Sequence, residues 1–454
     1  MQDINAGFVK NFLAIFCHKD QMNVYVENTM SSATNLIDFI HRPNYITHMK
    51  RMQAFKYELK LNGNQKGWLY RFAGSCRYVF NKALGLQKDR YEKGEKKLNY
   101  AGLCKLLTEW RNQPETIWLR DAPSQALQQS LKDLERAYTN FFAKRASFPR
   151  FKCRGARDSF RLPQGYKLEQ KNNRLFIPKL GWLRYHNSRD VLGTICNITI
   201  SRSCDKWYVS IQTERDVAEA IHPSKTAVGI DVGVAKLATL SDGKVFKNIQ
   251  SFGQYQKRLA FLQRSASKKR KFSHNWKKAI ASVSRVHRKI CCVRQDYLHK
   301  TTSAISKNHA LVCVEDLQIK NMSKSAAGNL VTPGKNVKAK SGLNKSILDQ
   351  GWYEFRRQLE YKEAWLGGSV LAVSPKNTSR TCPECAFVSA ENRQTQSSFL
   401  CVACGYEGNA DHVAAINILR AGHARLACGE LVQSGHSMNQ EPAEMTQVQE
   451  ACAW

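Results

Sequence analysis

Alternating apolar and polar positions mark several short stretches of the chain, and each stretch predicts a β-strand. Residues 54–61 have this period of two and end at Asn62-Gly63, a typical turn pair. Short runs of the same kind return after residue 150, separated by Asn, Gly, Asp and Pro, at residues 175–177, 182–185, 196–200 and 207–211. The pattern therefore predicts an all-β region that includes the first strand.

A helical spacing interrupts this region from residue 65 to about residue 143. It is clearest after the start signal Asp121-Ala122-Pro123. Apolar side chains recur there three and four residues apart, at Leu127, Leu131, Leu134, Tyr138 and Phe141. We therefore expect a helical domain inserted after the first strand.

Three later segments each deliver one carboxylate to a structural boundary. A β-branched run over residues 226–230 ends on Asp231 and begins an antiparallel meander that turns at Asp242-Gly243. A second apolar run over residues 311–314 ends on Glu315 and Asp316, and Asp411 opens a segment of helical spacing over residues 411–419. A solvated turn residue is the simple interpretation of each acid taken alone.

Taken together, the acids at these positions suit an RNase H-like nuclease. Phosphodiester hydrolysis uses two divalent ions about 4 Å apart, so the protein must gather carboxylates at one edge of a sheet. Oxygen ligands of this kind favour Mg²⁺ or Mn²⁺. Strand alternation points Asp316 to the face opposite Glu315, so we expect Asp316 to stand apart from the site.

Two cysteine pairs predict a zinc ribbon. Cys382 and Cys385 are followed, after 15 residues, by Cys401 and Cys404, a spacing that fits one tetrahedral Cys₄ site. A chance double pair or disulfides are the alternatives, and disulfides are disfavoured in a reducing cytosol. The site would be closed, hence structural, and would hold Asp411, which follows Cys404 by seven residues. We assign no role to His412, which stands beside Asp411.

The order of these motifs carries a family resemblance. The sequence reads GIDVGV at 229–234, VEDL at 314–317, CPEC at 382–385, CVACG at 401–405 and NADHVAAINIL at 409–419. Between about residues 49 and 419 the chain resembles TnpB, the transposon-encoded RNA-guided nuclease related to type V CRISPR effectors. Two positions depart from the family pattern: Ala386 stands where Gly commonly follows the first cysteine pair, and Val413 where Asn commonly follows the last acid by two.

The resemblance implies a set of roles. Asp231, Glu315 and Asp411 match the RuvC-type catalytic acids, which would bind two magnesium ions. Cys382, Cys385, Cys401 and Cys404 match the ligands of one structural zinc. The family also has a small β-barrel wedge domain that is split by a helical recognition lobe, which would account for the all-β and all-α regions.

Charge points to a polyanionic partner. The chain has 70 Lys and Arg against 37 Asp and Glu, a net charge of +33.

The 15 cysteines of the chain are an odd number with four in a recognisable framework, which indicates a reducing cytosol and not a disulfide scaffold. No apolar run approaches the roughly 20 residues of a membrane span, and the first 48 residues lack a signal-peptide pattern. We expect a cytoplasmic, nucleoid-associated prokaryotic protein with no membrane contact.

Two basic segments are candidate nucleic-acid surfaces. Residues 142–161 carry seven Lys and Arg against one Asp, interleaved with phenylalanines, and could either track phosphates and stack bases or form a solvated linker that the rings anchor. Residues 251–300 carry 14 Lys and Arg against one acid, Asp296, a load that self-repels on a helix unless phosphate lies alongside. The candidate contacts are Arg145, Arg150, Lys152, Lys268, Lys269, Arg270, Lys271, Lys277 and Lys278.

The remaining segments complete the expected order. Residues 319–343 are polar and predict a loop after Glu315, either a plain insertion or a gate. Residues 347–366 return to helical spacing, residues 369–373 form a strand, and helical periodicity is lost after Leu419. We expect the tail from residue 423 to 454 to be disordered because it is rich in Glu, Gln and Ser.

The predicted fold is a multidomain α+β protein with an RNase H-like (RuvC) nuclease domain, a β-barrel wedge, a helical recognition domain and a Cys₄ zinc ribbon. The boundaries are an unassigned extension at 1–48, the wedge at 49–64 and 149–224, the recognition domain at 65–148, the nuclease at 225–375 and 406–422, the ribbon at 376–405 and the tail at 423–454.

The favoured function is an RNA-guided, Mg²⁺-dependent DNA endonuclease. The family resemblance implies that its partners are a guide RNA encoded near the gene and double-stranded target DNA with a short adjacent motif. Two alternatives stay open: an RNase H-fold transposase that acts on transposon ends, and a non-catalytic RNA-binding zinc protein.

Overall fold

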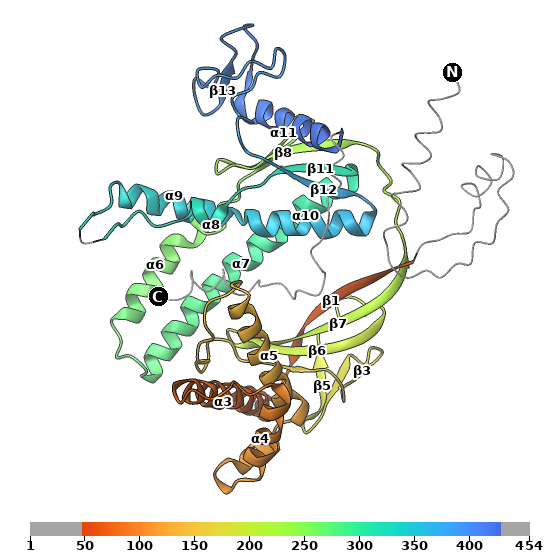
Figure 1. Ribbon diagram of the computed structural model, residues 1–454, viewed down its shortest axis with the longest axis vertical. Coiled ribbons are helices and arrows are strands. Elements are labelled where there is room, and N and C mark those ends of the chain that lie inside the picture. The colour runs from red at the N-terminus through yellow and green to blue at the C-terminus, as the bar shows by residue number, and fades with distance from the viewer. Residues whose placement is uncertain (1–47, 330, 428–454) are drawn as a thin grey trace, which may run out of the picture. The chain divides into compact units, whose positions relative to one another are not determined.

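The computed structural model describes residues 48–329 and 331–427 (Figure 1). The expectations for residues 1–47 and for the tail from residue 428 lie outside the described residues. No helix in the described part of the chain is both long and apolar enough to cross a membrane.

The first sheet has seven strands in the order β2-β6-β7-β1-β5-β4-β3, and the neighbouring strands are antiparallel. Its central strand β1 alternates as predicted and buries Phe55, Tyr57 and Leu59 on one face. It starts six residues earlier than the sequence pattern indicated, because its polar first part pairs with the end of β7. The strands are β1 (His48–Lys60), β2 (Ser159–Leu162), β3 (Lys167–Glu169), β4 (Arg174–Ile177), β5 (Gly181–Tyr185), β6 (Thr194–Ser203) and β7 (Lys206–Ala218).

Between β1 and β2 the chain is helical, as its spacing predicted. The helices are α3 (Gly63–Glu92), α4 (Tyr100–Asn112), the 3-10 helix η1 (Pro114–Asp121) and α5 (Ser124–Phe142). Asn62 begins α3 with a capping box. The Asn62 side chain accepts a hydrogen bond from the backbone N–H of Gln65, and the Gln65 side chain accepts one from the backbone N–H of Asn62. Leu127, Leu131 and Leu134 of α5 are fully buried and share one core with the first sheet.

The second sheet has five strands in the order β10-β9-β8-β11-β12. Its central strand β8 runs parallel to β11 and antiparallel to β9, and β11 runs parallel to β12. The strands are β8 (Ala227–Asp231), β9 (Lys236–Leu240), β10 (Val245–Lys247), β11 (Leu311–Glu315) and β12 (Ser369–Val373). The C-terminal ends of β8 and β11 therefore lie side by side, which places their terminal acids at one edge.

Helices cover both faces of this sheet. Helix α11 (Ala410–Ala427) packs on β8 from one face, and α10 (Trp352–Leu366) lies on the other (Figure 1). Gly229 in the middle of β8 makes the close approach of α11 possible, because a Cβ there would lie 2.1 Å from the carbonyl oxygen of Ala415. The glycine of the GIDVGV motif is thus required for the packing of the helix that carries Asp411.

Two long helices form the basic hairpin that precedes β11. They are α6 (Gly253–Ser267) and α7 (His274–Asn308), and they pack through Leu259, Val283, Val286 and Ile290. Ten of the 14 Lys and Arg of residues 251–300 therefore lie on helices, as predicted, and the other four, Lys268–Lys271, lie in the turn between them.

Two predicted boundaries are wrong. The expected loop over 319–343 contains α8 (Ile319–Met322) and the start of α9 (Val337–Gln350), whose exposed, Lys-rich first turns lack an apolar period. The predicted disordered tail from residue 423 is helical as far as Ala427, where α11 ends, because the last turns of this helix are mostly exposed and need no apolar spacing. Gly351, with φ +69°, separates α9 from α10 within the segment read as one helix.

Candidate active site and metal centre

The structure brings Asp231, Glu315 and Asp411 together at one edge of the five-stranded sheet. Asp231 is the last residue of β8, Glu315 the last residue of β11, and Asp411 lies in the first turn of α11. The parallel pairing of β8 with β11 and the packing of α11 on β8 account for this placement. Each of the three strand and helix positions was expected from the sequence.

The acids are electrically coupled. Burial raises the pKa of Asp231 to about 7, and the charges of Glu315 and Asp411 raise it in the same direction. Burial also raises the pKa of Glu315, against the opposing effects of a hydrogen bond from Thr378 and the charge of Arg393. Gathering carboxylates in a buried place lowers the stability of the folded protein. Bound divalent cations would offset the repulsion between them.

Two cations from other parts of the chain lie at this edge. Lys236, the first residue of β9, places its Nζ 3.0 Å from Oδ2 of Asp411. Arg393, from the segment between the cysteine pairs, acts through its charge on Asp231 and Glu315. Sequence reasoning missed both, and the only available signal was that Lys236 follows Asp231 by five residues, just after the GIDVGV motif.

Thr378 connects Glu315 to the helix that carries Asp411. Its hydroxyl donates to Oε1 of Glu315 at 2.6 Å. The Asn417 side-chain amide, buried on α11, donates to the backbone oxygens of Thr378 at 2.8 Å and Thr381 at 2.7 Å. These bonds fix the distance between β11 and α11, so the relative placement of Glu315 and Asp411 depends on side chains that the motif reading did not include.

Asp316 stands apart, as strand alternation predicted. Its carboxylate accepts from Nη1 of Arg356 at 2.7 Å, and about half of the side chain is exposed. The charges that most affect the pKa of Asp231 are instead those of Glu315, Asp411, Arg393 and Lys236. Asp316 is therefore a natural control for its neighbour Glu315.

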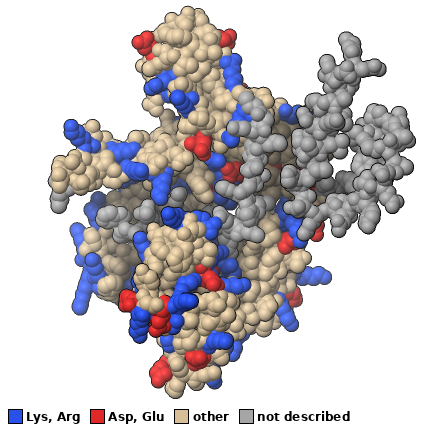
Figure 2. Space-filling view, in the orientation of Figure 1, with Lys and Arg blue, Asp and Glu red and all other residues tan. Residues whose placement is uncertain are grey.

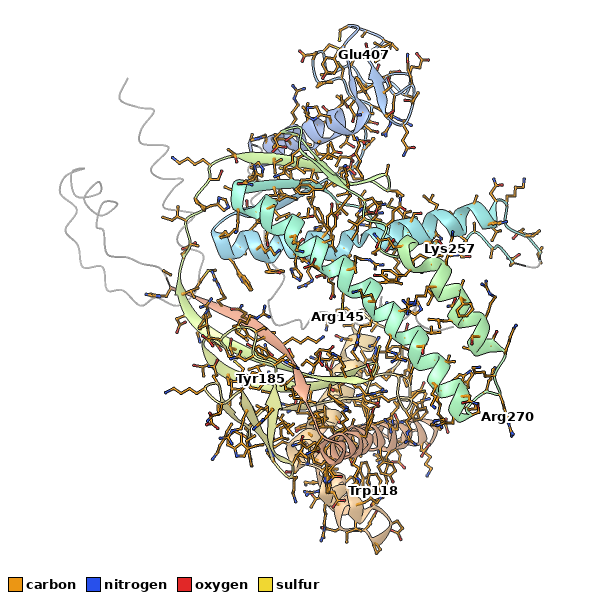
Figure 3. All side chains as sticks on the ribbon, turned by 180° about the vertical axis from the view of Figure 1, so that it is seen from behind. Trp118, Arg145, Tyr185, Lys257, Arg270 and Glu407 are labelled. Carbon is orange, nitrogen blue, oxygen red and sulfur yellow. The ribbon has the colours of Figure 1, made fainter. Side chains whose placement is uncertain are left out.

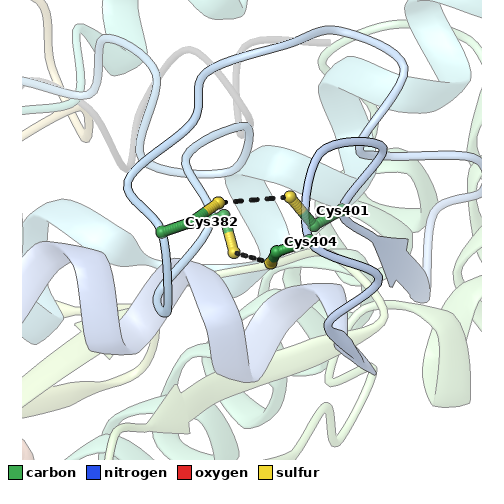
Figure 4. A group of neighbouring side chains, drawn as sticks. Cys382, Cys401 and Cys404 are labelled. Atoms are coloured by element: carbon green, nitrogen blue, oxygen red, sulfur yellow. Dashed lines mark hydrogen bonds between the residues drawn. The ribbon is translucent and has the colours of Figure 1, made fainter.

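The four predicted cysteines form one cluster (Figure 4). Their sulfur atoms all lie within 4.8 Å of one another, and the Cys382–Cys404 and Cys385–Cys401 pairs are 3.6 Å apart. Zn–S bonds of about 2.3 Å in a tetrahedron require sulfur atoms about 3.8 Å apart, so the cluster fits a zinc ion. Among the described residues it is the one group of metal-ligating side chains gathered this closely.

Matching turns present the two cysteine pairs. Ala386 N–H donates to Cys382 O, and Gly405 N–H donates to Cys401 O, so each pair closes with the same bond. The residue after each pair has a positive φ, +60° at Ala386 and +76° at Gly405. The departure of Ala386 from the family pattern thus places a side chain in a conformation that glycine adopts more easily. Val413, the second departure, is fully buried beside Cys382 and Cys401.

Most of the predicted nucleic-acid contacts are exposed. Arg145 and Arg150 are exposed in the segment that follows α5, and the basic cluster Lys268–Lys271 forms the turn between α6 and α7, where Arg270 marks the tip (Figure 3). Lys277 and Lys278 are exposed in the first turns of α7. On the face shown in Figure 2, Lys and Arg line the outer edge of this hairpin. None of these side chains forms an ion pair within the described part of the chain.

Lys152 differs from the others. Its Nζ lies 4.1 Å from the centroid of the Phe80 ring, and desolvation lowers its pKa. Its backbone N–H and oxygen both bond the side chain of Asn81. Lys152 is thus already engaged with α3, and the structure gives less support for a phosphate contact here than at the exposed cations.

The phenylalanines of residues 142–161 do not act alike. Phe160 is buried against Phe72, which fits the anchoring alternative. Phe148 packs edge-on against Phe141 yet stays partly exposed, and Lys88 lies over Phe148 and Phe151. Part of the segment therefore anchors the chain while part presents rings and charge to solvent.

Comparisons with known proteins agree with the order of these motifs. A family model described as "Probable transposase" matches residues 209–326, one described as "Cas12f1-like, TNB domain" matches residues 352–418, and one described as "Helix-turn-helix domain" matches residues 49–96. The chain is 59% identical over 399 residues to "Putative RNA-guided DNA endonuclease InsQ" of Escherichia coli K12, a match that covers 88% of this chain and 99% of that protein. The chain belongs to the TnpB/IS605 OrfB family.

A second relative has a lower sequence identity to this chain. "Putative RNA-guided DNA endonuclease" of Streptomyces pristinaespiralis is 32% identical over 408 residues, which cover 87% of this chain and 97% of that protein. Among solved structures, the "Cryo-EM structure of the Cas12f1-sgRNA-target DNA complex" aligns with a TM-score of 0.48 at 12% identity, over 82% of this chain and 98% of that one. In this TnpB family chain, the segment matched by the helix-turn-helix model is strand β1 followed by the single long helix α3.

Proposed function

We propose that this protein is an RNA-guided DNA endonuclease that cuts target DNA by metal-dependent phosphodiester hydrolysis. The observation that carries the proposal is the meeting of Asp231, Glu315 and Asp411 at one sheet edge, where burial, and after it the charges of Glu315 and Asp411, raise the pKa of Asp231. Family membership supports RNA guidance, because the most similar relative reported above carries that activity in its name. The cations at the tip of the basic hairpin, Lys268–Lys271, Lys277 and Lys278, form no ion pair within the described part of the chain, and this supports a polyanionic partner.

The acids fit two Mg²⁺ ions in an RNase H-like (RuvC) nuclease domain. Bound there, the ions would generate the attacking hydroxide and stabilise the leaving oxygen. Thr378 holds the Glu315 carboxylate in place, and Lys236 holds Asp411. Arg393 supplies positive charge near Asp231 and Glu315, where the negative phosphate of the substrate would lie.

We also propose one structural zinc on Cys382, Cys385, Cys401 and Cys404, because the sulfur spacing fits a tetrahedral ion. The seven-stranded sheet and the helices inserted after its first strand would be the wedge and recognition domains, and would read a short DNA motif beside the target. The guide RNA would be encoded near the gene.

The test is cleavage of guide-matched DNA by four single variants, with DNA and RNA binding measured in parallel. The guide is obtained by sequencing the RNA that co-purifies with the protein. We expect Asp231→Ala, Glu315→Ala and Asp411→Ala to abolish cleavage while binding survives, since phosphate recognition is spread over many Lys and Arg. Asp316→Ala, the control, should retain most activity. Full activity of the Asp231 or Asp411 variant would end the nuclease assignment.

A transposase is the second candidate, because one matching family model is described by that activity. The same acids could serve strand transfer in a related fold. A transposase should act on transposon-end DNA without RNA, so cleavage by protein freed of RNA would favour it.

A further inference from the structure

A pocket on the helical segment, far from the acids in sequence, has the chemistry of a nucleotide site. It measures about 910 Å³, within the size range of ligand pockets, and lies between one face of α3 and the 3-10 helix η1. The charged and aromatic side chains that line it are three cations, one acid and two rings: Arg71, Arg77, Lys82, Asp121, Tyr78 and Trp118. Figure 3 marks Trp118 beside α3.

The Trp118 ring is held in place but left open. Its centroid is 5.1 Å from that of Tyr78 in an edge-to-face contact, and its Nε1 donates to the oxygen of Glu115 at 3.2 Å. These two contacts orient the indole, yet 41% of the residue remains exposed. Its neighbour Leu119 is fully buried and anchors η1, so the exposure of Trp118 does not result from a loose segment. An oriented, exposed indole binds a flat ligand at little entropic cost.

The charges beside the ring suit a phosphodiester chain. Arg71 is exposed and lies 4.8 Å from the centroid of the Trp68 ring, and Lys82 lies 4.8 Å from the Trp110 ring and 5.8 Å from the Tyr78 ring. Aromatic rings thus hold both cations beside the pocket, and neither has a carboxylate partner within the described part of the chain. Arg77 is partly neutralised by Asp158 at 3.1 Å. The cations are therefore not equivalent, and Arg71 and Lys82 are the two available for an incoming anion.

Asp121 narrows the class of ligand. Its carboxylate forms no ion pair within the described part of the chain and would repel a phosphate, but it can accept a hydrogen bond from a hydroxyl or amino group. Ribose offers such a hydroxyl at the 2′ position and deoxyribose does not. Proteins that read RNA also favour unpaired bases stacked on aromatic rings.

We propose that this pocket binds one unpaired ribonucleotide, with the base stacked on Trp118, phosphates at Arg71 and Lys82, and the ribose hydroxyl facing Asp121. The inference rests on the proposed function in that it assumes an RNA-binding protein, and it adds a site that neither the family models nor the acid motifs assign.

The experiment compares Trp118→Ala, Trp118→Phe and Trp182→Ala in the full chain. Trp182 is a matched control, because it is equally exposed at 41% and has its own cation, Arg174, 5.1 Å away on a strand of the seven-stranded sheet. The probes are fluorescein-labelled 12-nucleotide poly(U) RNA and poly(dT) DNA. Thermal unfolding checks that each variant is folded.

We expect Trp118→Ala to weaken poly(U) binding by about 5- to 140-fold, the range for one stacked base, and Trp118→Phe to restore most of it. The salt slope should not change, because no charge is lost. Lys82→Ala should instead lower that slope by about 0.7. Trp182→Ala should bind as wild type, and poly(dT) binding should fall less than poly(U) binding in Trp118→Ala.

Equal losses in Trp118→Ala and Trp182→Ala, or unchanged poly(U) binding in Trp118→Ala, would overturn the site. Equal losses for poly(U) and poly(dT) would overturn the ribonucleotide assignment. Wild-type protein that neither binds poly(U) nor carries RNA on purification would instead refute the proposed function, so the two failures are distinguishable.

Discussion

The raised pKa of Asp231 means that ionising this carboxyl lowers the stability of the folded protein. This effect can be measured by unfolding, without an activity assay. The pKa of Asp231 is about 7 in the folded protein against 3.8 ordinarily. The carboxyl is neutral in both states below pH 3.8, so there is no cost there. As the pH rises from 3.8 to 7 the folded state holds more protons than the unfolded state, and stability falls; above pH 7 the loss is complete.

The size of the loss follows from the shift of about three pKa units. At 1.36 kcal/mol per unit it amounts to at most about 4 kcal/mol. Asp231→Asn removes the charge and keeps the shape. We therefore expect the variant, without magnesium, to unfold at a higher temperature than wild type at pH 8, by several degrees, and to lose this advantage as the pH falls toward 4.

The assay is thermal unfolding between pH 4 and pH 8, in buffer cleared of magnesium by ion-exchange resin, because a chelator would also attack the zinc ribbon. Asp316→Asn is the control and should gain nothing, since its carboxylate is already paired with Arg356. Added Mg²⁺ should then stabilise wild type more than Asp231→Asn, because only the intact acid set binds it well. An Asp231→Asn variant that is less stable at pH 8, or equally shifted at every pH, would refute the reasoning.

Four further predictions concern the metal centres and the hairpin. Cys401→Ser should lose about one zinc per chain by elemental analysis and lower the unfolding temperature, because structural zinc contributes folding free energy on the order of 10 kcal/mol in small modules; a zinc-free, fully folded wild type would contradict this. Ala386→Gly should stabilise the ribbon by up to about 1 kcal/mol in thermal unfolding, because φ is +60° there. Lys236→Met should lower the Mg²⁺ concentration that half-saturates thermal stabilisation at pH 8, because it removes a cation 3.0 Å from Asp411; a higher concentration would show that Lys236 helps to form the site. Replacing Lys268–Lys271 with Ala should lower the salt slope of nucleic-acid binding by about 0.7 to 0.9 per lost contact, and an unchanged slope would show that these side chains face water.

The sequence located the three acids and four cysteines because each is fixed by local pattern. A continuous apolar run shows where a buried strand ends, because the acid follows it directly in the sequence. Likewise, the two-residue gap within each cysteine pair can be seen in a few consecutive residues. The same logic placed most strands and the basic hairpin. It failed where burial does not govern the pattern, as in α9 and the end of α11, whose exposed residues carry no apolar period.

The supporting side chains could not be predicted, because they reach the site across long sequence separations. Lys236 and Asp411 are 175 residues apart, and Thr378 and Glu315 are 63 apart. A lysine after a strand motif, or a threonine before a cysteine pair, is in most proteins simply exposed to solvent, so neither residue signals a site by itself. Only the packing of α11 on β8, which Gly229 permits, decides that these residues meet.

These supporting contacts explain why a closed zinc site would matter to catalysis at a distance. The ribbon is inserted between β12 and α11, so its fold determines where α11 begins. Arg393 comes from within it, and Asn417 of α11 donates to the Thr378 backbone, whose hydroxyl in turn holds Glu315. Loss of the metal would thus release Asp411, Glu315 and Arg393 together. The proposed zinc site and the proposed hydrolytic site would share no ligand, and the bonds of Asn417 and Thr378 are what would couple them.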